Sequence, residues 1–300
     1  LVNGTAYTFS VVATNAAGNS EAATSAAVTP YTTPGKSPSV KASPENSGAV
    51  VSWQEPADGG SAITGYTVTA TPGGATCTTV STDTDPLSCT VGGLVNGTAY
   101  IFSVVATNAA GDGPAATSAA ETVTPRTTPG APTAVGGVGG NTQVTVSWTA
   151  PGNNGGSAIT GYTVTATPGG ATCTTVLTDT DPLSCTVGGL VNGTAYTFSV
   201  VATNAAGDGV GSAEPSATPY TTPGAPTAVS GVGGNTQVEV SWTAPADNGG
   251  SAITGYTVTA APGGATCTTV STDTDPLSCT VGGLVNGTAY TFSVVATNAA

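Results

Sequence analysis

The six cysteines are the residues whose spacing points most directly to chemistry. They form three pairs with members twelve positions apart: Cys77 and Cys89, Cys173 and Cys185, Cys267 and Cys279. Each pair occupies the same place in a repeated unit, so a disulfide bond within each unit is the obvious assignment. Disulfides persist in oxidising compartments, which predicts an extracellular or cell-surface location. Zinc is the alternative, but two thiols per unit without any His fall short of its usual ligand count.

Paired carboxylates lie between the two cysteines of every unit, in the sequence Thr-Asp-Thr-Asp-Pro. They are Asp83 and Asp85, Asp179 and Asp181, and Asp273 and Asp275. Alternating carboxylates on a closed loop could offer oxygens to calcium, but they lack the spaced ligands of a known calcium loop. A solvated turn, which Asp and Pro favour, is the simpler interpretation. No metal or cofactor is predicted.

Catalytic constellations are not found in this sequence. It contains no His to act as a general base and no cysteine outside the three pairs to act as a nucleophile. The glycine-rich runs lack the strand-to-helix context of a phosphate-binding loop. We therefore expect a non-enzymatic protein segment, which leaves open a catalytic domain elsewhere in a longer polypeptide.

Charge is sparse and almost entirely negative. Lys36, Lys41 and Arg126 are the only basic residues against sixteen Asp and Glu, and the formal net charge is −13. Such a surface repels phosphate backbones and anionic lipids, so nucleic acid and membrane surfaces are poor partners. No apolar run is long enough to span a bilayer, so no membrane insertion is expected in this segment.

One seventeen-residue stretch recurs four times and organises the chain. It starts at Leu1, Leu94, Leu190 and Leu284, and Ile101 is its only internal change. Tyr196, Phe198, Val200 and Ala202 alternate with more polar residues, which is typical of a half-buried β-strand. The copies begin 93, 96 and 94 residues apart, about the size of one β-sandwich domain. We expect domain boundaries at 1–32, 33–127, 128–221 and 222–300, with Trp53, Trp148 and Trp242 in the cores. Pro-rich linkers between the units predict stiff joints.

The order of these elements resembles the fibronectin type III domain. The resemblance rests on Pro132, Trp148, Tyr162 and the stretch from Leu190 to Tyr196, and it repeats along the chain. It implies an all-β fold of tandem immunoglobulin-like antiparallel β-sandwiches, with seven strands in two sheets per domain. It also implies that each cysteine pair ties an edge strand of one sheet to an edge strand of the other. The similar neighbouring copies look like arrays in secreted or surface-exposed bacterial proteins.

The recurring Leu-Val-Asn-Gly-Thr-Ala-Tyr segment resembles the tyrosine corner of such sandwiches, in which a Tyr hydroxyl bonds to upstream backbone. The corner residues are Leu94 and Tyr100, Leu190 and Tyr196, and Leu284 and Tyr290. The family commonly has Pro where this chain has Asn96, Asn192 and Asn286. Asn-Gly-Thr at these sites and at Asn3 also satisfies the N-glycosylation pattern, although a turn explains it.

The loops at Asn108–Gly113 and Asn204–Gly209 lie where some members of the family present an integrin-binding motif. The sequence contains no Arg-Gly-Asp anywhere, so we interpret these loops as glycine-rich hairpin turns.

These features favour an extracellular structural array that serves as a stalk, fibre or surface-layer component. The expected partners are neighbouring copies in an assembly, with a cell-surface protein or glycan as a further candidate. Spacer modules of a secreted polysaccharide-degrading enzyme, or a cell-surface adhesin, are the alternatives. Residues 1–32 read as the last two strands of a domain and residues 222–300 lack a closing strand. A window cut from a longer array, or strand donation between chains, would account for this.

Overall fold

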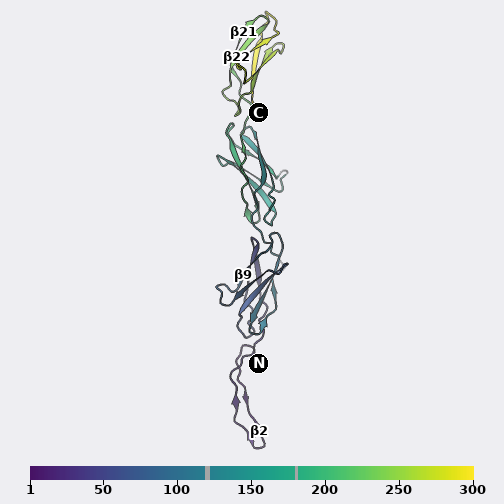
Figure 1. Cartoon of the computed structure of the whole chain (residues 1–300), viewed down its shortest axis with the longest axis vertical. Helices are drawn as coiled ribbons and strands as arrows, with labels where there is room; N and C mark the ends of the chain where they lie inside the picture. Colours follow the sequence, from purple (N-terminus) through teal and green to yellow (C-terminus); the bar gives the residue numbers. More distant parts are fainter. Residues whose placement is uncertain (119–121, 180–181) are drawn as a thin grey trace. The chain divides into compact units, whose positions relative to one another are not determined.

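The computed structural model describes residues 1–118, 122–179 and 182–300, and every regular element in these ranges is a β-strand (Figure 1). The chain divides into two compact units. The first comprises Leu1–Thr128 with Asn153–Ala158 and Ala205–Gly207. The second comprises Pro129–Gly152, Ile159–Asn204 and Asp208–Ala300. The all-β class expected from the alternating pattern is confirmed.

The first unit begins with a long hairpin and continues with a sandwich. In the hairpin, β1 pairs with β4 and β2 with β3. The sandwich has a three-stranded sheet in the order β5-β6-β9 and a second sheet in the order β11-β10-β7-β8, with β12 also paired to β10. The bounds are β1 Ser10–Val11, β2 Thr14–Asn15, β3 Gly18–Asn19, β4 Ala23–Thr24, β5 Val40–Glu45, β6 Gly48–Trp53, β7 Gly65–Thr71, β8 Thr76–Val80, β9 Ser88–Gly92, β10 Ile101–Asn108, β11 Gly111–Asp112 and β12 Ala116–Thr117.

The second unit repeats this two-sheet topology in two successive sandwiches, each with its own core. Its sheets have the orders β13-β14-β17, β16-β15-β18-β19 with β20 on β18, β21-β22-β25, and β24-β23-β26. The bounds are β13 Thr133–Gly140, β14 Gln143–Thr149, β15 Ile159–Thr167, β16 Thr172–Val176, β17 Ser184–Gly188, β18 Tyr196–Asn204, β19 Gly207–Asp208, β20 Ser216–Ala217, β21 Thr227–Gly234, β22 Gln237–Thr243, β23 Gly255–Ala261, β24 Thr266–Val270, β25 Ser278–Gly282 and β26 Thr291–Thr297.

The core of each sandwich follows the period of the strands. In β18, every second residue from Tyr196 is buried, and Phe198 and Val200 are completely inaccessible. Trp148 lies on the facing sheet, with its ring centroid 5.3 Å from that of Tyr162, and Trp53 and Trp242 pack in the same way on their own tyrosines. Alternation therefore buries one side of each sheet, because successive side chains of a strand point to opposite faces.

Candidate functional site: the disulfide loops, the corners and the linkers

The three disulfides connect the edges of the two sheets in each sandwich. The bonds are Cys77–Cys89, Cys173–Cys185 and Cys267–Cys279, and the structure describes no free cysteine. In the second unit, Cys173 lies opposite Val164 on the edge strand β16, and Cys185 lies opposite Val146 on the edge strand β17. Both half-buried sulfurs pack on the core, so each bond is a covalent crossing between the sheets.

The acidic loops inside these disulfides are held by their own hydrogen bonds. The Asp83 carboxylate accepts a bond of 2.8 Å from the Val80 amide, and Asp179 and Asp273 accept equivalent bonds from Val176 and Val270. Thr79, Thr175 and Thr269 donate to the carbonyls of Pro86, Pro182 and Pro276. The first Asp of each loop therefore closes a turn, as Asp does in loops generally.

The second Asp of each loop has no common role. Asp275 accepts bonds from the Leu277 amide and the Ser278 hydroxyl, Asp85 is exposed, and Asp181 lies outside the described residues. Among the described residues no group of three or more His, Cys, Asp or Glu side chains could hold a metal ion. The hydrogen bonds of Asp83, Asp179 and Asp273 are those of a turn, as the simpler interpretation expects.

The tyrosine corners have the hydrogen bond that defines them. Tyr100 accepts a bond of 3.0 Å from the Val95 amide, and Tyr196 and Tyr290 accept bonds of 3.1 Å from Val191 and Val285. The accompanying Leu94, Leu190 and Leu284 are buried. Each corner fixes where the following strand enters the core.

The asparagine of each corner has a role that the sequence analysis missed. Asn192 Oδ1 accepts a bond from the Thr142 amide, and its Nδ2 donates to Asn141 Oδ1. Asn96 and Asn286 make the same two bonds to the turns at Asn46–Ser47 and Asn235–Thr236. Nδ2 is the atom that would carry an N-linked sugar, and here it is already a donor within the fold. The corner therefore fastens the turn between the first two strands of its sandwich.

The first of the loops considered for integrin-like recognition contains a buried clamp at Asn108, and the equivalent Asn298 of the last copy makes a similar one. Asn108 Nδ2 donates to the carbonyls of Thr32, Asp58 and Ser61 at 2.9, 2.7 and 3.3 Å. Asn298 Nδ2 donates to Thr221 and Asn248, both at 2.8 Å. Because these amides are buried, they hold linker, loop and hairpin together rather than reaching a partner.

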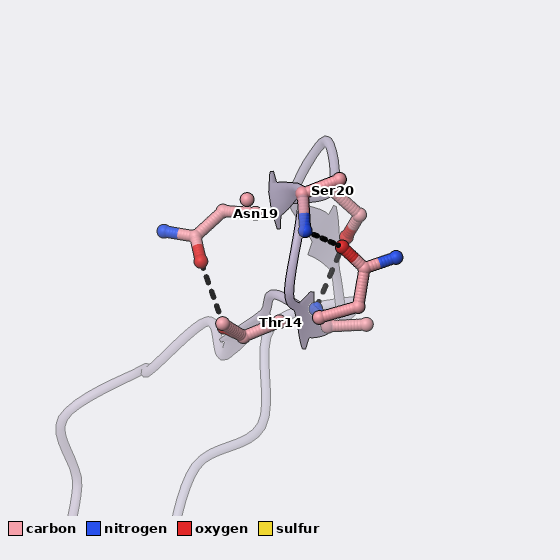
Figure 2. A pocket seen from close by; sticks show the side chains of 7 residues that line it. Thr14, Asn19 and Ser20 are labelled. Carbon is pink, nitrogen blue, oxygen red and sulfur yellow. Dashed lines mark hydrogen bonds between the residues drawn. The ribbon is translucent and has the colours of Figure 1, made fainter.

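The corresponding hairpin near the start of the chain has an open hollow of about 350 Å³ on its surface (Figure 2). Thr14 donates to the Asn19 side chain at 2.7 Å, and Ser20 Oγ accepts from the Ala13 amide. The lining has no charged or aromatic side chain, so it offers no group for catalysis or for stacking on a ligand.

The linkers are hydrogen-bonded on both sides. In the first unit, Gly4 donates to the Pro30 carbonyl and Thr32 donates to the Gly59 carbonyl, at 3.0 and 2.9 Å. In the second unit, Gly193 donates to Pro219 and Thr221 donates to Gly249, at 2.9 and 2.8 Å. These short Pro-containing segments are therefore ordered parts of the structure.

Burial raises the pKa of three tyrosine hydroxyls, those of Tyr66, Tyr162 and Tyr256, and the Glu55 carboxylate raises the pKa of Tyr66 further. All three rings pack on the core tryptophans, which marks them as structural residues. In the described part of the chain, no helix is long and apolar enough to cross a membrane.

Comparison with known proteins links these features to a family. The model of the family "Fibronectin type III domain" matches residues 33–123, 128–218 and 222–300. A solved structure of chicken CNTN1 FN1-FN3 domains is similar with a TM-score of 0.34 and 22% identity, over 88% of this chain and 94% of that one.

Several curated relatives carry the names of polysaccharide-degrading enzymes. Endoglucanase B of Cellulomonas fimi is 36% identical over 69% of this chain, and Exoglucanase B of the same species is 36% identical over 83%. Chitinase A1 of Niallia circulans is 39% identical over 53% of this chain. The aligned regions make up 21%, 23% and 22% of these relatives, so the chain spans only about a fifth to a quarter of their length.

Proposed function

The chain belongs to the fibronectin type III domain family, and from that premise we propose that it is a non-catalytic spacer within a secreted polysaccharide-degrading protein. The observation that carries the proposal is the similarity to two glucanases and a chitinase, each over about a fifth to a quarter of its length. The matched residues of this chain fall in fibronectin type III domains, which are not catalytic. The similarity therefore favours the spacer, held above as an alternative, over a self-sufficient fibre.

The local structure suits a spacer that works outside the cell. The covalent crossing in each sandwich stabilises the fold against unfolding, and disulfides form and persist in oxidising surroundings. Backbone hydrogen bonds hold the linker segments in an ordered conformation instead of leaving them as free chain. We accordingly place the protein in the extracellular space, with a catalytic domain of the same polypeptide as its functional neighbour.

The proposal is tested on the native protein of the producing organism. An antibody raised against residues 128–221 is used on culture supernatant, beside a gel that contains glucan or chitin and shows clearing where polysaccharide is hydrolysed. We expect the immunoreactive band to coincide with a cleared band. An immunoreactive band without hydrolysis, in material that sediments as filaments, would contradict the proposal and show that the protein is a structural polymer.

A second measurement addresses the spacer role itself. Deleting residues 128–221 from the full-length protein removes one whole copy and shortens the spacer. Hydrolysis of a soluble substrate should be unchanged, whereas hydrolysis of an insoluble one should fall because the catalytic domain loses reach. Equal loss on both substrates would show that the domain supports catalysis directly.

A further inference from the structure

We propose that the Gly-Gly loop of each domain is a docking surface whose partner is the corner turn of the preceding copy. The Gly-Gly loop is Gly59–Gly60 in the first unit and Gly249–Gly250 in the second. The corner turn is Asn3–Gly4 in the first unit and Asn192–Gly193 in the second. The proposal goes beyond the spacer function, since it holds whether or not a catalytic domain is attached.

In the second unit the two segments meet backbone to backbone. A Cβ atom on Gly250 would overlap the Gly193 amide nitrogen and lie 2.9 Å from the Asn192 Cβ. A Cβ atom on Gly193 would lie 3.1 Å from the Gly250 Cα. A Cβ atom on Gly250 would overlap the facing backbone, and one on Gly193 would push it away by a few tenths of an ångström. Glycine at both positions therefore allows an approach closer than other residues permit.

The first unit repeats this geometry with a different flanking residue. A Cβ atom on Gly60 would overlap the Gly4 nitrogen, and one on Gly4 would lie 3.3 Å from the Gly60 Cα. The Gly60 amide donates to the Asp58 side chain, as the Gly250 amide donates to Asn248, both at 2.9 Å. Asp or Asn thus shapes the same loop in both units.

Backbone conformation alone does not account for the Gly-Gly loop. Gly250 has a φ of +84°, which favours glycine, but Gly263 in the turn after β23 has a φ of +96° with nothing within 4 Å of its Cβ position. Gly263 therefore needs glycine only for its backbone, whereas Gly250 needs it for its backbone and for the contact.

The corner turn has the same conformation in two copies of the repeat. Gly287 has a φ of +80° with nothing within 4 Å of its Cβ position, and Gly193 has a φ of +81°. The bond from the Thr236 amide to Asn286 matches that from Thr142 to Asn192. Because these bonds lie within one domain, the corner turn is held by its own sandwich, which lowers the conformational entropy lost on docking.

The test compares amide hydrogen exchange by NMR in the full chain and in two variants. Gly250→Val places a branched side chain at the contact, and Gly263→Val imposes the same kind of backbone conflict in open space. In Gly250→Val we expect the Gly193 and Thr221 amides to exchange at least about tenfold faster, since local opening governs exchange. In Gly263→Val both amides should keep their wild-type rates.

Wild-type rates at Gly193 and Thr221 in Gly250→Val, or equal acceleration in both variants, would overturn the proposal. If Gly250→Val unfolds its domain, as Trp242 fluorescence would show, Gly250→Ala is measured in its place with the same expected direction.

Discussion

At the residue scale, the corner asparagine shows how one amide can fasten two distant segments. Replacing Asn192 by Ala removes the acceptor of the Thr142 amide and the donor to Asn141. We expect a loss of about 1–2 kcal/mol in the free energy of unfolding, the usual net value of two hydrogen bonds. Urea denaturation of N192A measures it, and N3A is the control because the Asn3 side chain makes no hydrogen bond in the described structure. A change below about 0.3 kcal/mol in N192A would show that these bonds contribute nothing.

The buried tyrosines give a pH-dependent prediction. Burial raises the folded-state pKa of Tyr66, Tyr162 and Tyr256 above the ordinary value near 10. Their contribution to stability is therefore full below about pH 10 and is lost as pH rises through the raised folded values. An absorbance titration should show a component that ionises above pH 10, and Tyr66→Phe should remove one tyrosine from that component. A single transition near pH 10 with the fold intact by circular dichroism would contradict this.

The sequence predicts the role of a residue best when the residue's hydrogen-bond partner lies nearby along the chain. The hydrogen bond of the tyrosine corner joins Val191 to Tyr196, five positions apart, so its pattern is complete within one short segment. The bond from Asn192 to Asn141 spans 51 residues and joins two turns whose composition already has a local explanation. Nothing in either turn distinguishes an amide that bonds across the sandwich from one that faces water, so only the fold shows it.

At the element scale, the glycines of β13 make room for β20 and the residues that follow it in the same sandwich. A Cβ atom on Gly139 would overlap the Thr218 carbonyl oxygen, whereas one on Gly136 in the same strand meets nothing within 4 Å. We expect Gly139→Ala to lower stability by about 1–3 kcal/mol through overpacking, and Gly136→Ala to be neutral or slightly stabilising. Denaturation midpoints of both variants decide this, and equal effects would show that β13 shifts freely.

The disulfide acts between elements, since it joins β16 to β17 across the two sheets. Replacing both Cys173 and Cys185 by Ala should lower the free energy of unfolding by about 3 kcal/mol, because the open chain regains the entropy that a loop of this size removes. Guanidinium denaturation of the double variant, with Cys267 and Cys279 intact, gives the value. An unchanged midpoint would mean that the sheets are held by packing alone.

The period of apolar residues predicts strands well and their irregularities poorly. Alternation in Tyr196–Asn204 predicts β18, since every second side chain is buried there. The register shift between Thr133 and Gly136 was not predicted, although it places Ala134 at a φ of +50°. Alanine gives no local signal of a left-handed conformation, which is uncommon outside glycine and asparagine. The pairing of β13 with β14 imposes it.

At the scale of the whole molecule, the sequence shows the repeat but not its use. Trp148 and its equivalents fill the same cores whether the array forms a fibre or separates two enzyme modules. The residues that build a sandwich therefore do not distinguish a fibre from a spacer. The similarity to glucanases and a chitinase favours the spacer. The negative charge is compatible with either role.

The scarcity of basic residues makes trypsin a probe of linker order. Its only sites follow Lys36, Lys41 and Arg126. Lys41 is paired with Ser52 in the sheet, and the backbone amide of Arg126, which lies in a linker, donates to the Glu45 carbonyl. Proteases need several residues of extended, mobile chain, so an ordered linker should be cut at least about tenfold more slowly than the reduced, unfolded protein.

The control for this experiment is Ala16→Arg, which places a site at the exposed tip of the first hairpin. The introduced site should be cut within the time in which Arg126 survives, which separates linker order from a general resistance of the chain. Residues 127–300 contain no site, so cleavage at Arg126 releases them as one fragment, easily seen by mass spectrometry. Cleavage at Arg126 as fast as at the introduced hairpin site would mean that the linker bonds open freely. The array would then be a chain of independent domains, and its reach would depend on linker length rather than on the joints.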